Sequence, residues 1–110
     1  MNSDTNEKES MYDSLWKLKV RNEWFKYKIH ATTTRDITMF HHDPNAPFRY
    51  DIPKPYIESI CPKGTRVRVW MVSRFGDVGV TDNIENPIGY NVRGLDADKD
   101  LTNYEIVKLY

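Results

Sequence analysis

The sequence has a single cysteine, no long apolar run and no excess of charge of either sign. Cys61 is the only cysteine, which excludes an internal disulfide and fits a reducing compartment. No apolar run approaches the roughly 20 residues of a membrane-spanning helix, and the polar start MNSDTNEKES contains no signal-peptide core. Lysine and arginine number 16, as do aspartate and glutamate, so the chain as a whole is not a strong polyanion binder. We therefore expect a cytoplasmic protein without a membrane partner.

Aromatic residues, by contrast, are plentiful, with three Trp, seven Tyr and four Phe among 110 residues. A chain of this length forms one domain with a modest core. Bulky side chains suit the thin core of a small β-barrel or sandwich. Residues 1–12 are mostly polar and predict a disordered tail, which leaves residues 13–110 as a single domain.

Alternation of apolar and polar residues predicts five or six short strands. Trp16, Leu18 and Val20 share one face, and the alternation restarts out of phase with Phe25 and Tyr27, so residues 16–31 predict an N-terminal hairpin. Further strands are expected at residues 37–40, 66–72, 77–81, 89–95 and 103–110. Residues 41–62 hold five of the six prolines and predict a long, stiff surface loop. Turn signals every 8 to 12 residues indicate an all-β barrel or sandwich.

Residues 63–81 resemble the KOW motif of SH3-like barrels, which occurs in ribosomal proteins and transcription elongation factors. Gly64, Val67, Val69, Gly76 and Gly79 fall in the register of that motif. The motif's usual turn glycine is absent, and Val72 stands near that position. More broadly, residues 63–110 resemble the second half of an SH3-like barrel. The resemblance implies a small SH3-like barrel of five to six strands, with the N-terminal hairpin supplying the remaining strands.

The composition as a whole, short and rich in Asn, Asp, Lys and Tyr, is similar to that of small accessory proteins of large tailed phages. This similarity implies a phage-encoded protein that works in the cytoplasm of a host cell.

No residue pattern points to catalysis or to a metal site. His41 and His42 are adjacent, so on an extended chain their side chains point to opposite sides, and no second pair completes a ligand set with His30. Cys61 lies beside a proline without a nucleophile signature. The Asp96, Asp98 and Asp100 series lacks the glycine and distal glutamate of a calcium loop and suits a polar turn. We expect no enzyme, no cofactor and no metal.

One candidate surface is basic and aromatic, and would bind RNA or DNA. Residues 63–74 carry four Lys or Arg and no acid, and residues 17–35 carry six against one Glu. Guanidinium groups contact phosphates, and aromatic rings stack on bases. The candidate nucleic-acid-binding residues are Arg66, Arg68, Arg74, Phe75, Lys17, Lys19, Lys26 and Lys28.

The other candidate surface would bind a protein. Its residues are the exposed aromatics Phe48, Tyr50, Tyr56 and Trp70, since tyrosine and tryptophan favour interfaces. We prefer this reading: a small regulatory or inhibitory module that docks on a larger protein of the host nucleic-acid or defence machinery. Free strand edges would also permit a homodimer. Direct binding of RNA or DNA is the alternative hypothesis. Acidic side chains within the basic surface would argue against it.

Overall fold

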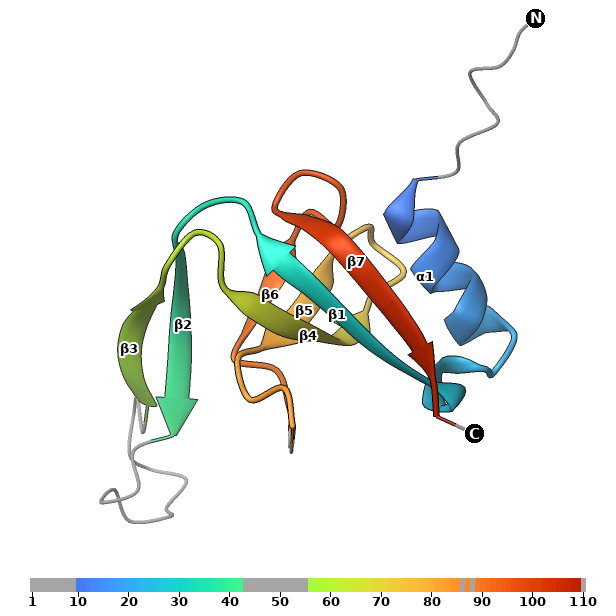
Figure 1. The fold of residues 1–110 in the computed structure, drawn as a ribbon, viewed down its shortest axis with the longest axis horizontal. Coiled ribbons are helices and arrows are strands. Elements are labelled where there is room, and N and C mark those ends of the chain that lie inside the picture. The colour runs from blue at the N-terminus through green and yellow to red at the C-terminus, as the bar shows by residue number, and fades with distance from the viewer. Residues whose placement is uncertain (1–9, 43–55, 86, 88, 110) are drawn as a thin grey trace, which may run out of the picture.

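The computed structural model describes residues 10–42, 56–85, 87 and 89–109 and contains one α-helix and seven strands there (Figure 1). The elements in chain order are α1 (Met11–Val20), the short 3-10 helix η2 (Trp24–Lys26), β1 (Tyr27–Thr33), β2 (Ile37–His42), β3 (Tyr56–Cys61), β4 (Arg66–Val72), β5 (Val78–Thr81), β6 (Val92–Leu95) and β7 (Leu101–Lys108). Residues 1–9 of the expected tail lie outside the described residues, and α1 begins at Met11.

All strand pairs are antiparallel, and they form a five-stranded sheet and a separate hairpin. The sheet has the order β6-β5-β4-β1-β7, and the hairpin consists of β2 and β3. The expectation of a mainly β chain is confirmed. No closed barrel is present in the part of the chain that the structure describes.

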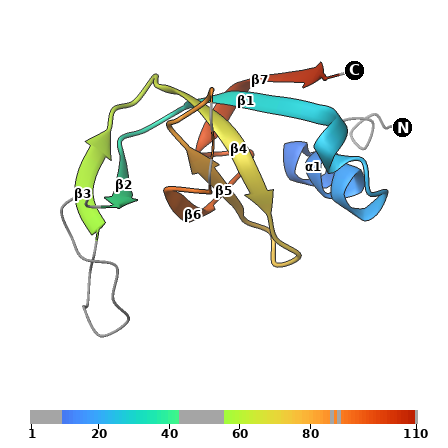
Figure 2. The same cartoon turned by 90° about the horizontal axis from the view of Figure 1, so that it is seen from below.

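The β2–β3 hairpin is an arm that extends from the sheet (Figures 1 and 2). β1 leads into β2 and β3 leads into β4, so the arm continues the β1–β4 pair beyond a bend. Two backbone hydrogen bonds close the bend. Thr33 N–H donates to Thr65 O at 3.0 Å, and Gly64 N–H donates to Thr33 O at 2.9 Å. The Asp36 carboxylate accepts a further bond from the Lys63 amide at 2.8 Å.

The core lies on the α1 side of the sheet and continues into the arm, where Ile37 and Met39 of β2 and Cys61 of β3 are also buried. Its fully buried members include Leu15 from the helix, Ala31 from β1, Val67 from β4 and Val80 from β5. α1 covers this face of the sheet at one end (Figure 2). Burial of aliphatic side chains from every layer is the main stabilising contribution in a domain of this size.

The expected strand and hairpin over residues 16–31 are wrong in their first half, because residues 11–20 form α1. Ser10 caps the helix by accepting a hydrogen bond from the Asp13 amide at 3.1 Å. The helix ends in a Schellman motif: Asn22 adopts a left-handed φ of 59°, and Glu23 N–H bonds to Leu18 O at 2.8 Å. Val20, which the strand reading would bury, is 64% exposed.

The expected irregular loop over residues 41–62 is also wrong at both ends. His41 and His42 belong to β2, and Tyr56–Cys61 forms β3. Prolines flank β3 but none lies within it. Every residue of β3 therefore keeps the backbone N–H that can bond to β2. Residues 43–55 of the expected loop lie outside the described residues.

The other expected strands are confirmed, with small shifts of their ends. β4 covers residues 66–72 as expected, β5 begins one residue late, and β6 covers only the second half of residues 89–95. Within β4, strict alternation from Val67 and Val69 would place Met71 on the buried face, but a register shift against β5 lies between Val69 and Met71. Val72 is consequently buried and Met71 is not.

Candidate binding groove

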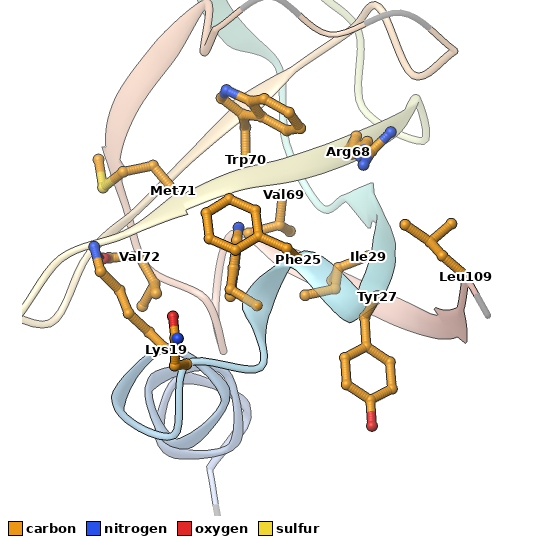
Figure 3. Close-up of a pocket in the computed structure, with 12 residues that line it drawn as sticks. Lys19, Phe25, Tyr27, Ile29, Arg68, Val69, Trp70, Met71, Val72 and Leu109 are labelled. Atoms are coloured by element: carbon orange, nitrogen blue, oxygen red, sulfur yellow. Dashed lines mark hydrogen bonds between the residues drawn. The ribbon is translucent and has the colours of Figure 1, made fainter.

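A cavity of about 410 Å³ opens between the end of α1, η2 and the second half of β4 (Figure 3). We call it the groove. Its buried base consists of Ile29, Val69 and Val72. Its other lining residues are Lys19, Asn22, Trp24, Phe25, Tyr27, Arg68, Trp70, Met71 and Leu109. The volume lies within the range of small-molecule and side-chain pockets.

Phe25 is the most exposed aromatic of the groove, with 76% of its surface accessible. The Schellman motif at Asn22 turns the chain out of α1, and η2 then carries Trp24 and Phe25 towards β4. In the close-up, Phe25 lies between Trp70 on β4 and Lys19 from the end of α1 (Figure 3). The sequence analysis treated Phe25 only as part of the apolar alternation of the expected hairpin, so this residue was missed as a site residue.

Trp70 owes its position to a β-bulge. Val69 pairs with Val80 and Met71 with Gly79, so Trp70 is an extra residue in β4. Bulges bend a strand and redirect a side chain, and they recur beside functional sites. The guanidinium carbon of Arg68 lies 5.0 Å from the centroid of the Trp70 ring, which is a cation–π contact.

Arg68 has no carboxylate within ion-pair distance among the described residues. Partial burial lowers its pKa below the ordinary value, and the charge of Glu85 opposes this shift. Lys19 provides a second cation in the groove, and its Nζ donates to the backbone oxygen of Val72 at 3.2 Å. No acidic side chain lines the groove in the described part of the chain.

Arg66, two residues before Arg68, is already bonded within the protein. It donates through Nη1 to Thr32 Oγ1 at 3.0 Å and to Asn103 O at 2.5 Å. Its Nη2 lies 3.5 Å from the carboxylate of Glu105, which is also 3.9 Å from His30. An acidic side chain therefore interrupts the basic face of the sheet at this point.

The remaining basic candidates do not line the groove. Lys17 projects from α1, Lys26 forms an ion pair with Glu23 at 3.8 Å, and Lys28 lies on β1 opposite Val107. Arg74 stacks over Phe75 in the turn between β4 and β5, with 5.1 Å between guanidinium carbon and ring centroid. The structure thus brings together Arg68, Trp70 and Lys19 from the two expected surfaces.

The aromatic candidates for protein binding are separated. Trp70 lines the groove, whereas Tyr56 on β3 lines another cavity of about 360 Å³ with Phe40 and Tyr90. Phe48 and Tyr50 lie outside the described residues. The groove instead gains Trp24, Phe25, Tyr27 and Leu109, and the available signal was the dense aromatic run that follows Asn22.

The polar clusters have structural partners. Asp96 accepts from the amides of Asp98 and Lys99, as expected for a polar turn. His41 Nε2 lies 2.8 Å from Asp82 Oδ2. Cys61 is a buried free thiol. Among the described residues, no three His, Cys, Asp or Glu side chains are grouped so that they could hold a metal ion.

The described residues include no helix with the length and apolar character to cross a membrane. No protein-family model matches the sequence. No curated protein and no solved structure is significantly similar to the chain. The functional proposal therefore rests on the groove.

Proposed function

We propose that the chain is a non-enzymatic binding module that docks on a larger protein through the groove. The observation that carries this proposal is the exposure of Phe25 and Leu109, 76% and 46%, beside a cavity with further aromatic walls. Large aromatic side chains around a hollow are typical of the energetic centre of protein interfaces. Burial of Phe25 alone against a partner would contribute about 1.5–3 kcal/mol.

The proposal includes an SH3-like architecture for the module. The last strand of the sheet, β7, pairs with the first, β1, and β4, β5 and β6 follow as successive neighbours, an order that SH3-like barrels also have. Gly76 has a φ of 101° in the turn before β5, and a Cβ on Gly79 would lie 3.2 Å from Tyr90. These two positions therefore have the glycine requirements that a KOW-like hairpin implies.

The composition similar to that of tailed-phage accessory proteins suggests the kind of partner. We propose a regulatory or inhibitory role on a larger protein of the host nucleic-acid or defence machinery. Small barrels host many binding activities, so the architecture alone does not select this role.

Direct binding of RNA or DNA is the second candidate, and the stacked pair of Arg68 and Trp70 supports it. Such a pair offers both a phosphate contact and a stacking surface. The pairing of Arg66 with Glu105 argues against it, because a nucleic-acid strand needs a track of available cations. Protein docking is therefore the stronger proposal.

The experiment is site-specific photo-crosslinking from two matched positions. A benzophenone amino acid replaces Phe25 in one variant and Phe75 in another, since the two side chains are 76% and 78% exposed. We expect the probe at position 25 to crosslink one dominant protein in nuclease-treated host lysate. The probe at position 75, outside the groove, serves as the control.

Equal crosslinking from both positions, or a crosslink that appears only in a parallel lysate without nuclease and is to nucleic acid, would contradict the protein-docking proposal. The second of these results would favour the nucleic-acid reading instead.

A further inference from the structure

We infer that the partner's docking segment carries an acidic side chain next to a large apolar one, and that Arg68 receives the carboxylate. This inference rests on the proposed function and specifies the chemistry of the partner at the same groove. The apolar side chain would enter the cavity against Phe25 and Trp70. The ligand is thus an acidic-aromatic or acidic-aliphatic peptide segment of another protein.

The first argument is the contrast between two arginines on one strand. Arg66 is held by a hydroxyl, a backbone carbonyl and the carboxylate of Glu105. Arg68 has the Trp70 ring as its close contact and no described carboxylate within 4.0 Å. The charge of Glu85 reaches Arg68 only from beyond ion-pair distance and does not offset the cost of its partial burial, which an incoming carboxylate in direct contact would relieve.

The second argument is the charge of the groove as a whole. Lys19 donates to one backbone oxygen and retains further N–H donors, because an ammonium group has three. Two cations and no described acid face a largely apolar hollow. Electrostatic complementarity therefore favours an anionic partner, and it would also exclude basic competitors.

The third argument concerns the kind of anion, and it favours the carboxylate of a peptide over the phosphates of a nucleic acid. The apolar hollow accepts one bulky side chain, and its two cations lie at opposite ends of it, Arg68 at one and Lys19 beside Val72 at the other (Figure 3). The neighbouring basic side chains Arg66 on β4 and Lys26 on η2 already pair with acids. A nucleic-acid strand would need several successive cations, whereas a short acidic segment needs only Arg68 and Lys19.

The test is a selection from short randomised peptides displayed on yeast, with the full chain as bait. We expect the enriched peptides to contain Asp or Glu within two residues of an aromatic or large aliphatic residue. The bait variant Arg68→Gln should bind these peptides about 10- to 100-fold more weakly, because hydrogen bonds between charged groups are strong. Arg74→Gln makes the same chemical change outside the groove and should leave their affinity unchanged.

Enrichment of neutral peptides would overturn the inference, as would failure to enrich any peptide or equal losses in the two variants. The crosslink from position 25 reports separately on the proposed function, since it requires a partner protein of any charge. Competition by oligothymidylate that depends on both Arg68 and Arg74 would instead favour the nucleic-acid candidate.

Discussion

His30 is a partly buried histidine among positive charges. Its side chain is 13% exposed, and its Nε2 has no hydrogen-bond partner. Burial is the largest cause that lowers its pKa below 6.5, and Lys28, Arg66 and Arg68 add to it while Glu105 opposes it. The neutral imidazole is therefore the form that the folded protein favours.

The first prediction concerns pH. The unfolded chain takes up a proton on His30 near pH 6.5, whereas the folded chain does so only at lower pH. The contribution of neutral His30 to the free energy of unfolding is thus complete above pH 6.5 and is lost as the pH falls through the folded pKa. We expect urea unfolding to show a smaller loss of stability below pH 6.5 in His30→Gln than in the wild type. Equal losses in the two proteins would contradict the assignment, and the exposed His42→Gln serves as control.

Two arginines show that a local sequence pattern cannot predict the partners of a side chain. Arg66 and Arg68 are two residues apart on β4, so strict alternation places them on the same face, and both are half-buried. Their difference comes from Glu105 and Asn103 on β7, more than 35 positions away in the sequence. Local patterns cannot supply such partners, because they depend on which strand pairs with β1.

At the scale of elements, α1 is the clearest failure of the period-two pattern. Trp16, Leu18 and Val20 alternate with lysines, but the same residues follow a capping serine and precede an asparagine that tolerates a left-handed φ. Helix ends fixed by Ser10 and Asn22 therefore outweigh a short alternation. The β4–β5 hairpin, in contrast, was predictable because valine alternation and Gly76 agree with each other.

The second prediction concerns the attachment of α1 to the turn between β6 and β7. Asp98 accepts hydrogen bonds from the first two helical amides, Met11 N–H at 2.7 Å and Tyr12 N–H at 3.3 Å. These amides have no acceptor within the helix, and a carboxylate also complements the helix dipole. We expect Asp98→Ala to lower the free energy of unfolding by about 0.5–2 kcal/mol in urea titrations.

The matched control for this prediction is Lys99→Ala, since Lys99 is an exposed neighbour in the same turn. Equal stability of Asp98→Ala and the wild type would show that the contact with the helix end contributes nothing. A comparable loss in both variants would assign the effect to the turn and not to the helix.

On the scale of the whole molecule, the sheet and the arm are joined through Asn91. Its N–H donates to Val80 O, and its C=O accepts from Phe40 N–H. Its side-chain amide donates to Phe40 O at 3.0 Å, and its side-chain oxygen accepts from Thr81 Oγ1 at 2.6 Å. The sequence shows this residue only as part of an expected strand, because residues 41–62, which contain β3, were expected to form a loop and not the second strand of an arm.

The last prediction follows from that junction. Asn91→Ala removes both side-chain hydrogen bonds but keeps the two backbone bonds. Only the bond to Phe40 joins the arm, and since a hydrogen bond contributes about 0.5–1.5 kcal/mol, we expect amide exchange in β2 and β3 to accelerate about 2- to 13-fold. Amides in the centre of the sheet, in β1 and β4, should exchange at wild-type rates.

Uniform acceleration through the whole chain would contradict this prediction, because it would mean that arm and sheet unfold as one cooperative unit. If the arm opens independently of the sheet, binding at the groove should not depend on the arm. The groove contains no residue of β2 or β3, so Asn91→Ala should keep the crosslink from position 25 while the arm loosens. Loss of that crosslink would instead show that the partner contacts the arm as well as the groove, which would place the docking surface across both parts of the molecule.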